Sequence, residues 1–423
     1  MRVLLVVSEW GTGPFSQGIV RPTKTLVDAL CTKGHVVHVL ATKRGLISSE
    51  TRAGSEPNFS LEGLEPRPFD FFPRGKLRFR EYVADAIVNW VPDIVISQDW
   101  QGLAAGYAKR IDRSPLVTWI HGGTMYDLHG KGRGPRSRSE LVMAGLESYQ
   151  IEHSQLVVSP SALLVKIYRD EYQITVPSNE VIPYHFPNPL RIPTAPASWP
   201  LNIVFAGRLS RRKGIEVFLK AAQSAHRQLS GVRVQIFGKS VDYDGQQIAR
   251  RLKRLGIWSE YCGQLSPEAV WAKICARNSV LVVTSILDNS PNTVYEAIAN
   301  RVPVLILGSQ NGASELRKYS ESVVASSQLK SVDWTIFTNR SNSELRGPPE
   351  LSGLNHSITA SWLSALRIAR TTAERQQSRP YPTLLTKTPG LRGVSGRSLQ
   401  NGLRRTWILL LNRAIAVFTS SPN

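Results

Sequence analysis

The sequence has few cysteines and no long hydrophobic run. Its 423 residues include only Cys31, Cys262 and Cys275, an odd number whose spacing matches no metal site. This pattern argues against a disulfide framework and favours a reducing compartment. No apolar stretch reaches the roughly 18 residues that suggest a spanning helix, and the run at residues 3–7 is too short for a signal peptide. We therefore expect a cytoplasmic protein, either soluble or peripheral to a membrane.

Acidic residues are scarce relative to basic ones. There are 32 Asp and Glu against 52 Lys and Arg, which gives a net charge of +20. Such an excess favours anionic partners, among them nucleotides, phosphates, acidic lipid surfaces and nucleic acid. The basic residues are spread over loops and the C-terminal tail, and no nucleic-acid recognition motif accompanies them. A nucleic-acid partner is therefore not expected.

The first half of the chain alternates short apolar segments with helical ones. A strand at 3–7 precedes a loop that contains glycines, a helix at about 21–32 and a second strand at 35–41. Further strands are expected at 92–97, 116–120 and 156–158. Short, continuously apolar strands that alternate with helices predict a parallel sheet buried on both faces.

Proline separates this unit from a second one. Six of the eighteen residues at 183–200 are proline, which disrupts regular helix and sheet and predicts an interdomain linker. Strands are then expected again at 202–206, 232–237, 280–284 and 302–307, and a late helix at 358–374. The predicted divisions are a first domain at 1–185, a linker at 186–200, a second domain at 201–345, and a C-terminal helix with a basic tail at 346–423.

The segment GRLSRRKG, residues 207–214, lies between a predicted strand and a predicted helix of the second domain. Ligands of open parallel sheets bind beyond the carboxyl ends of the strands. Arg208 supplies a planar fork of donors and Lys213 a compact charge, a suitable pair for a diphosphate. A solvated basic loop is the alternative interpretation of this segment alone. As a loop cation, Lys213 is expected to be dispensable for folding.

A second segment, DNSPNTVYEAIANRVPV, starts at Asp288 after the predicted strand at 280–284. Ser290 is a candidate cap and Pro291 a candidate first residue of a helix. The backbone N–H groups then expected to form an anion site at the helix start are those of Asn292, Thr293 and Val294. Glu296, one turn further on, can accept hydrogen bonds from a vicinal diol such as a ribose. The alternative is a surface helix with an acidic first turn.

Together with PDIVISQDWQG at 92–102 and PLVTWIHGG at 115–123, these segments resemble glycosyltransferase family 4 over roughly residues 1–320. The resemblance implies a GT-B architecture, in which two Rossmann-like, doubly wound α/β domains face each other across a cleft. The family has two glutamates separated by seven residues. Glu296 matches the second of them, whereas Asp288 stands where the family has the first.

The resemblance also implies roles for individual residues. Arg208 and Lys213 would bind the donor diphosphate, Glu296 the ribose, and His121 would lie near the transferred sugar. The residues expected to act at the reacting centre are His121, Asp288, Arg208 and Lys213. The residues expected to bind the donor are Gly13, Gly207, Arg208, Lys213, Gly238, Asn292, Thr293, Val294 and Glu296. For His121 and Gly238 the alternatives are a buried polar residue and a turn glycine.

The implied reaction transfers a sugar, with retention, from a UDP- or GDP-linked donor to a hydroxyl of a glycan or lipid-linked acceptor. Two cations and a helix N-terminus would stabilise the departing diphosphate, so no metal and no other cofactor is expected. One alternative is a nucleotide-sugar epimerase on the same architecture. Another is a catalytically degenerate GT-B protein that binds nucleotide or acts as a scaffold.

Three basic segments concern the acceptor and the membrane. Residues 74–80 and 131–138 lie in the first domain, which in this family generally receives the acceptor. An ordinary solvated face is the alternative, and it is the more usual explanation of a single run of charge. Residues 404–418 have the pattern of a basic amphipathic helix. This helix would contact an anionic membrane at its inner face or dock on the protein's own surface.

Overall fold

Strands β1 (Arg2–Val7) and β2 (Val36–Ala41) run parallel and are joined through helix α1 (Val20–Thr32), as the sequence predicts. The structure, a computed structural model, describes residues 1–11, 18–42, 58–64, 73–190, 200–308, 311–338 and 351–377. Helix α1 buries Leu26, Val27 and Leu30 against the sheet. Gly34 then adopts a φ of +77°, which glycine tolerates, and the chain turns back into β2.

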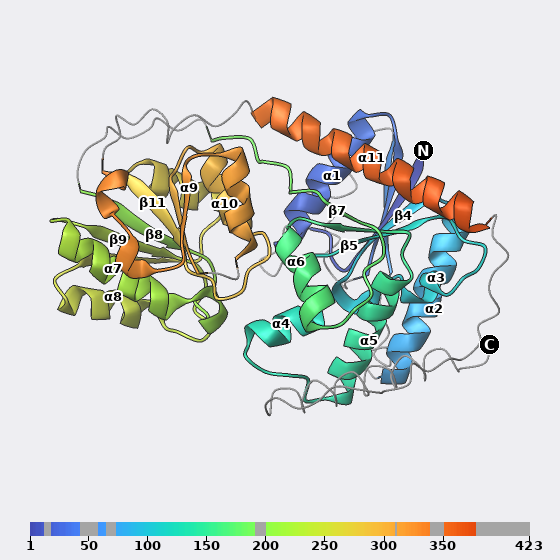
Figure 1. Cartoon of the computed structure of the whole chain (residues 1–423), viewed down its shortest axis with the longest axis horizontal. Helices are drawn as coiled ribbons and strands as arrows, with labels where there is room; N and C mark the ends of the chain where they lie inside the picture. Colours follow the sequence, from blue (N-terminus) through green and yellow to red (C-terminus); the bar gives the residue numbers. More distant parts are fainter. Residues whose placement is uncertain are drawn as a thin grey trace.

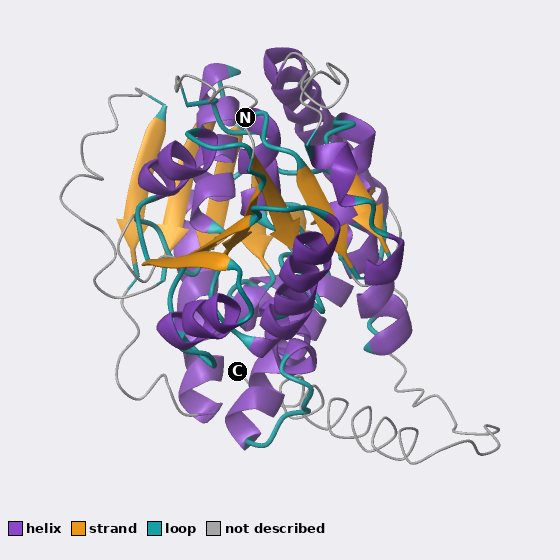
Figure 2. Ribbon diagram, turned by 90° about the vertical axis from the view of Figure 1, so that its left-hand side faces the viewer, coloured by secondary structure: helices purple, strands orange, loops and turns teal. Residues whose placement is uncertain are grey.

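The first lobe is built on a seven-stranded parallel sheet in the order β3-β2-β1-β4-β5-β6-β7. Its other strands are β3 (Phe59–Gly63), β4 (Ile94–Gln98), β5 (Leu116–Trp119), β6 (Leu156–Ser159) and β7 (Asn179–Val181). Its other helices are α2 (Pro73–Trp90), α3 (Ala105–Ala108), α4 (Thr124–Gly130), α5 (Arg138–Glu152) and α6 (Ala162–Lys166). Every residue of β4, β5 and β6 is buried because helices cover both faces of the sheet (Figure 2).

The second lobe repeats this plan with six parallel strands in the order β10-β9-β8-β11-β12-β13. The strands are β8 (Asn202–Ala206), β9 (Arg233–Phe237), β10 (Trp258–Gly263), β11 (Ser279–Val283), β12 (Val304–Leu307) and β13 (Val323–Ser326). The helices are α7 (Ile215–Gln228), α8 (Gly245–Arg254), α9 (Pro267–Cys275) and α10 (Asn292–Ala299), and short 3-10 turns include Arg211–Lys213 and Gly312–Tyr319. The predicted architecture of two doubly wound parallel-sheet units is confirmed.

Helix α11 (Leu351–Gln377) leaves the second lobe and packs along the first (Figure 1). Trp362 meets Trp119 of β5 edge-on, with ring centroids 4.9 Å apart. The side chain of Asn355 exchanges two hydrogen bonds with the backbone of Phe186. The last described helix therefore fastens the end of the chain to the first lobe. It begins seven residues before the predicted start at residue 358 because Asn355 and its neighbours find partners there.

The sequence did not predict the edge strands β3, β7, β10 and β13. An edge strand has one sheet neighbour and is half covered, so its residues need not be apolar. Strand β3, FSLEG, illustrates this, since none of its residues is buried. Among the described residues, no helix combines the length and the apolarity needed to cross a membrane.

Candidate functional site

The two second-lobe segments singled out in the sequence meet at the carboxyl ends of β8 and β11. The Lys213 ammonium donates to Oδ2 of Asp288 at 2.5 Å, and the Ser285 hydroxyl donates to the same oxygen at 2.9 Å. Only 20% of the Lys213 side chain and 10% of the Asp288 side chain are exposed. The predicted convergence of the two segments is thus seen directly, as a nearly buried ion pair.

Positive charge exceeds negative charge around this pair. Burial works to raise the pKa of Asp288, but the charges of Lys213 and Arg212 outweigh it and hold that pKa below its ordinary value. Burial lowers the pKa of Lys213, and the charges of Arg212 and Arg208 act in the same direction against the opposing effect of Asp288. The site therefore presents three cations to one carboxylate, which suits it to an anionic ligand.

Glycines let backbone segments approach closely beneath these side chains. Gly214 has a φ of +71°, and a Cβ placed on it would lie 1.8 Å from the Thr284 carbonyl oxygen. Gly238 has a φ of +130°, and a Cβ there would lie 1.9 Å from the Gly207 carbonyl oxygen. The close packing of the two strand ends is enough to explain why residue 238 is glycine. This agrees with the alternative interpretation of Gly238 as a turn glycine.

Helix α10 begins one residue later than predicted. Pro291 has an extended ψ of 123° and occupies the cap position, so Asn292 is the first helical residue. Ser290 does not cap the helix, because its hydroxyl pairs with the Tyr295 hydroxyl at 2.7 Å. The Val294 N–H donates to the Pro291 carbonyl at 3.0 Å, so the prediction that it is open to a ligand is wrong. The N–H groups that stay available for an anion are those of Asn292 and Thr293.

Glu296 lies at the boundary between the lobes. Its carboxylate accepts from the indole N–H of Trp271 at 2.8 Å and from the guanidinium of Arg21, which belongs to α1 of the first lobe. Burial raises the pKa of Glu296, although both donors oppose this effect. The Asn292 side chain adds a second bridge, donating to the Gly18 carbonyl at 2.5 Å.

These contacts border a pocket between the lobes. Its lining residues are Arg21, Pro22, Thr25, Tyr184, His185, Pro187, Asn292, Tyr295 and Glu296. The predicted donor residue Gly13, in the loop that leads to Gly18, lies outside the described residues. The pocket thus brings Glu296 and Asn292 of the second lobe against the start of α1.

On the opposite side of the boundary, His121 follows the carboxyl end of β5. The residue is half-buried with its Nε2 atom fully covered, and Nδ1 lies 2.7 Å from the Tyr184 hydroxyl. Burial lowers the pKa of His121 to about 3, so the imidazole is neutral near pH 7. Asn289 of the second lobe donates to the His121 carbonyl at 3.4 Å. His121 therefore faces the segment that carries Asp288.

A buried carboxylate holds the backbone of this loop. Asp99 accepts hydrogen bonds from the N–H groups of His121 at 2.9 Å and Gly122 at 3.1 Å, and from the Tyr168 hydroxyl at 2.6 Å. The Tyr168 oxygen in turn accepts from the Gly123 N–H at 2.8 Å. Three successive amides are thus fixed by two buried side chains, which sets the position of the imidazole.

A second buried carboxylate, Glu147 of α5, fixes the start of α4. It accepts from the Thr124 N–H at 2.6 Å, the Thr124 hydroxyl at 2.8 Å and the Gln101 N–H at 2.9 Å. Burial and the nearby charge of Asp99 nevertheless raise the pKa of Glu147 to about 8. Gly123 leaves room for this carboxyl group, since a Cβ there would lie 2.5 Å from a Glu147 oxygen and would force the side chain to shift.

This pKa predicts a specific pH dependence of stability. The folded protein keeps the Glu147 proton up to about pH 8, whereas the unfolded chain releases it near the ordinary value of 4.5. Unfolding therefore releases a proton in this window, and the Glu147 contribution to stability falls as the pH rises through it. In Glu147→Gln that slope should be lost, whatever the variant's absolute stability. Melting temperatures of both proteins from pH 5 to about pH 9 would test this, and equal slopes would contradict it.

The predicted basic segments of the first lobe divide into residues engaged in structure and exposed residues, the latter being Arg78, Lys131, Arg136 and Arg138. Arg80 is buried, with 3% exposed, and donates to the Gln101 carbonyl, so the expectation of a solvated or acceptor-facing residue is wrong there. Lys76 donates to the Ser139 hydroxyl at 2.7 Å. Arg133 pairs with Glu140 at 2.8 Å. The basic tail at 404–418 lies outside the described residues.

Several site residues escaped the sequence analysis. Arg212 is one of four basic residues in GRLSRRKG, and nothing in the spacing distinguished it. Asp99 was present in PDIVISQDWQG only as part of a motif. Arg21 and Tyr184 gave no signal, because they reach the site only through packing between segments far apart in the chain. An Asp directly after a buried strand is the one feature that could have marked Asp99 as a strand-end group.

Residues 16–184 match the family model of Glycosyltransferase Family 4, and residues 200–329 match that of Glycosyl transferases group 1. No curated protein matches the chain in sequence. Among solved structures, sucrose-phosphate synthase from Thermosynechococcus elongatus is 18% identical with a TM-score of 0.57, over 89% of this chain and 94% of that one. Anabaena HepE in complex with UDP and glucose is 16% identical with a TM-score of 0.55, over 89% of this chain and 100% of that one. At such identities the likeness concerns the fold.

The two family models match the two lobes in chain order, one model to each parallel sheet. The solved structures extend the likeness to 89% of this chain, more than either family model covers alone. The family and architecture expected from the sequence are therefore confirmed. The chain belongs to the GT-B glycosyltransferases of the family 4 kind.

Proposed function

We propose that this protein transfers a hexose from a nucleoside diphosphate to a hydroxyl of a glycan or lipid-linked acceptor, with retention of configuration. The observation that carries the proposal is the nearly buried Lys213–Asp288 pair at the strand ends of one lobe, opposite His121 at a strand end of the other. Cations in such a place meet the main difficulty of the reaction, the charge that builds on the departing diphosphate.

In this proposal the cations of the second lobe bind the diphosphate. Lys213 and Arg208 supply the charge, and the N–H groups of Asn292 and Thr293 add the positive end of α10. No metal would then be required, and a chelator should leave transfer unchanged. Asp288 would lie at the transferred sugar, on a shorter arm than the family's glutamate.

Glu296 would accept the ribose hydroxyls. Its two oxygens already accept from Trp271 and Arg21, so the ribose would have to displace Arg21 or share an oxygen with it. Donor binding would in that way involve a residue of α1, across the boundary between the lobes. Binding of the nucleotide would therefore change the Arg21–Glu296 contact, which joins the two lobes.

The donor nucleotide is proposed to be UDP or GDP. Support for UDP comes from HepE, whose structures contain UDP or UDP-glucose. A starch synthase with the same fold is bound to ADP, so ADP-sugars belong in any test. A role in polysaccharide or glycolipid synthesis in the cytoplasm, with residues 404–418 touching the inner face of an anionic membrane, completes the proposal.

The proposal is tested by a thermal-shift screen against UDP-, GDP- and ADP-sugars. A true donor at about a hundred times its dissociation constant should stabilise the folded protein by about 2.7 kcal/mol, a rise of a few degrees in melting temperature. Glu296→Ala should reduce that rise by weakening donor binding. No shift with any nucleotide sugar would count against the proposal. Product analysis then separates transfer from its rivals, since an epimerase converts the donor without acceptor and a degenerate protein binds without turnover.

A further inference from the structure

Tyr126 lies on α4, one turn after His121. Its ring is 5% exposed and packs directly over Gly122, where a Cβ would come within 2.6 Å of the ring. The ring shares an apolar cluster with Ile120 of its own lobe and Leu287 of the other. Its hydroxyl is buried and has no hydrogen-bond partner among the described residues.

The buried Tyr168, Tyr184 and Tyr295 around this loop all have hydroxyl partners, which are Asp99, His121 and Ser290. The half-buried Tyr172 bonds His129. A buried hydroxyl without a partner costs roughly 1–3 kcal/mol relative to one that is paired. Phenylalanine would fill the same space without this cost. The unpaired Tyr126 hydroxyl therefore calls for a partner that the free protein does not supply.

The Tyr126 ring lies between the His121 loop and the segment that carries Asp288. Leu287, which belongs to the same apolar cluster as Tyr126, directly precedes Asp288, and Asn289 donates to the His121 carbonyl. Burial raises the pKa of the Tyr126 phenol, and the charge of Asp288 acts in the same direction while that of Arg212 opposes it. A second orphaned polar atom belongs to the same loop, since Nε2 of His121 is buried without a partner among the described residues.

The two orphaned atoms share a chemical character. A phenol and a neutral imidazole both form hydrogen bonds without carrying charge. Such groups match sugar hydroxyls, which donate and accept, better than they match phosphate oxygens, for which Lys213 and Arg212 are nearby. We propose that the Tyr126 hydroxyl binds a hydroxyl of the sugar being transferred, beside Nε2 of His121, and so helps to select the donor sugar. This inference rests on the proposed function.

The test compares Tyr126→Phe with the unchanged protein in binding UDP-glucose and UDP by calorimetry, with GDP-mannose and GDP as a second pair. The sugar nucleotide should bind on the order of tenfold more weakly to the variant, the size of one lost hydrogen bond. The bare nucleotide should bind equally to both proteins. The melting temperature of the free variant should be unchanged or higher, because the removed hydroxyl has no partner to lose.

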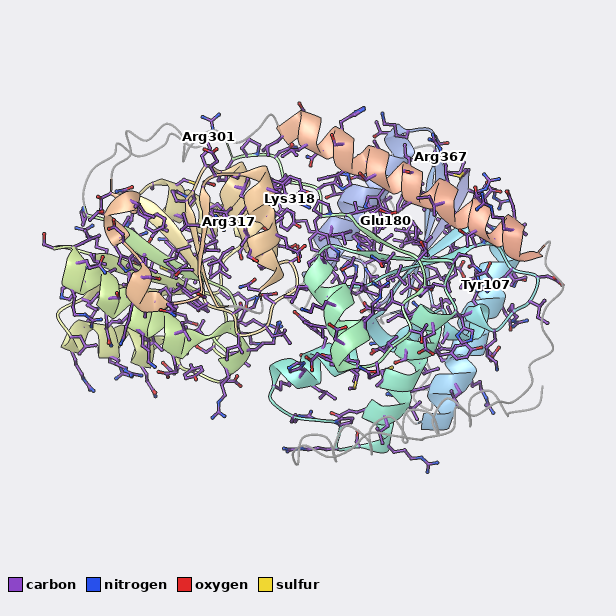
Figure 3. All side chains as sticks on the ribbon, in the orientation of Figure 1. Tyr107, Glu180, Arg301, Arg317, Lys318 and Arg367 are labelled. Atoms are coloured by element: carbon purple, nitrogen blue, oxygen red, sulfur yellow. The ribbon has the colours of Figure 1, made fainter. Side chains whose placement is uncertain are left out.

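Tyr107→Phe is the matched control. Tyr107 is also buried, but its hydroxyl donates to the Ser114 carbonyl at 3.1 Å, and Figure 3 shows it on the side of the first lobe away from the second. This variant should lose stability and keep both affinities.

The outcomes separate the two proposals. If no nucleotide binds the unchanged protein, the proposed function fails and the inference fails with it. If nucleotides bind and Tyr126→Phe leaves the advantage of UDP-glucose or GDP-mannose over the bare nucleotide intact, only the inference is overturned. A clear drop in the melting temperature of free Tyr126→Phe would also overturn it, since the hydroxyl would then have a partner within the protein.

Discussion

Replacing Lys213 with alanine is expected to lower sugar transfer by about 100- to 1000-fold, the range observed when one group that stabilises a transition-state charge is removed. The loss should fall on kcat and on donor affinity together, because the ammonium would contact the diphosphate both before and after bond cleavage. Steady-state kinetics with the donor found in the screen would measure it.

The same substitution is also expected to destabilise the fold. From the sequence, Lys213 is a loop cation whose removal should leave the fold intact, and the structure corrects this. Asp288 is only 10% exposed and loses the ammonium at 2.5 Å, although Arg212 still offsets part of its charge. Breaking such a pair leaves a nearly buried charge without its partner, at a cost of about 1–3 kcal/mol given the remaining exposure and the second cation.

A double variant separates the two effects. Lys213→Ala combined with Asp288→Asn removes both charges, so the melting temperature should recover towards that of the unchanged protein. Transfer should stay low, because the cation is still missing. Arg211→Ala is the matched control, since Arg211 is an exposed basic residue of the same turn and should leave transfer within about twofold. Normal turnover in Lys213→Ala would refute the assignment of this residue to the diphosphate.

The second large effect is expected at Gly214. An alanine Cβ there would lie 1.8 Å from the Thr284 carbonyl oxygen, which belongs to backbone and cannot simply rotate away. The φ of +71° adds the strain of a left-handed conformation. Gly214→Ala should therefore cost about 4 kcal/mol or more, beyond the usual range for a single substitution. It should also displace the turn that holds Lys213 and so reduce donor binding.

Gly34→Ala provides the matched comparison, because its φ of +77° is similar and nothing lies within 4 Å of the added Cβ. Only the conformational strain applies there, about 1–2 kcal/mol. Chemical denaturation of both variants gives the two free energies of unfolding. If both variants lost the same free energy of unfolding, the close approach of Gly214 to the Thr284 carbonyl would not contribute to the cost of the substitution.

The sequence alone determined the architecture and one half of the site. Apolar strands, intervening helices and a proline-rich break define two parallel-sheet units, and parallel strands necessarily bring their carboxyl ends to one edge. Lys213 follows β8 and Asp288 follows β11, and these strands are neighbours in the sheet, so their meeting could be foreseen.

Tertiary packing decided the remaining contacts of the site. These contacts join residues far apart in the chain, and no pattern in the sequence indicates that such residues will meet. Arg21 meets Glu296 across 275 residues, and Asn289 meets His121 across 168. Local preference favours Ser290 as the cap of α10. Its hydroxyl pairs with that of Tyr295 instead, and the cap position falls to Pro291. Local rules assign strands and turns, whereas the partner of a buried polar group depends on which distant segment arrives beside it.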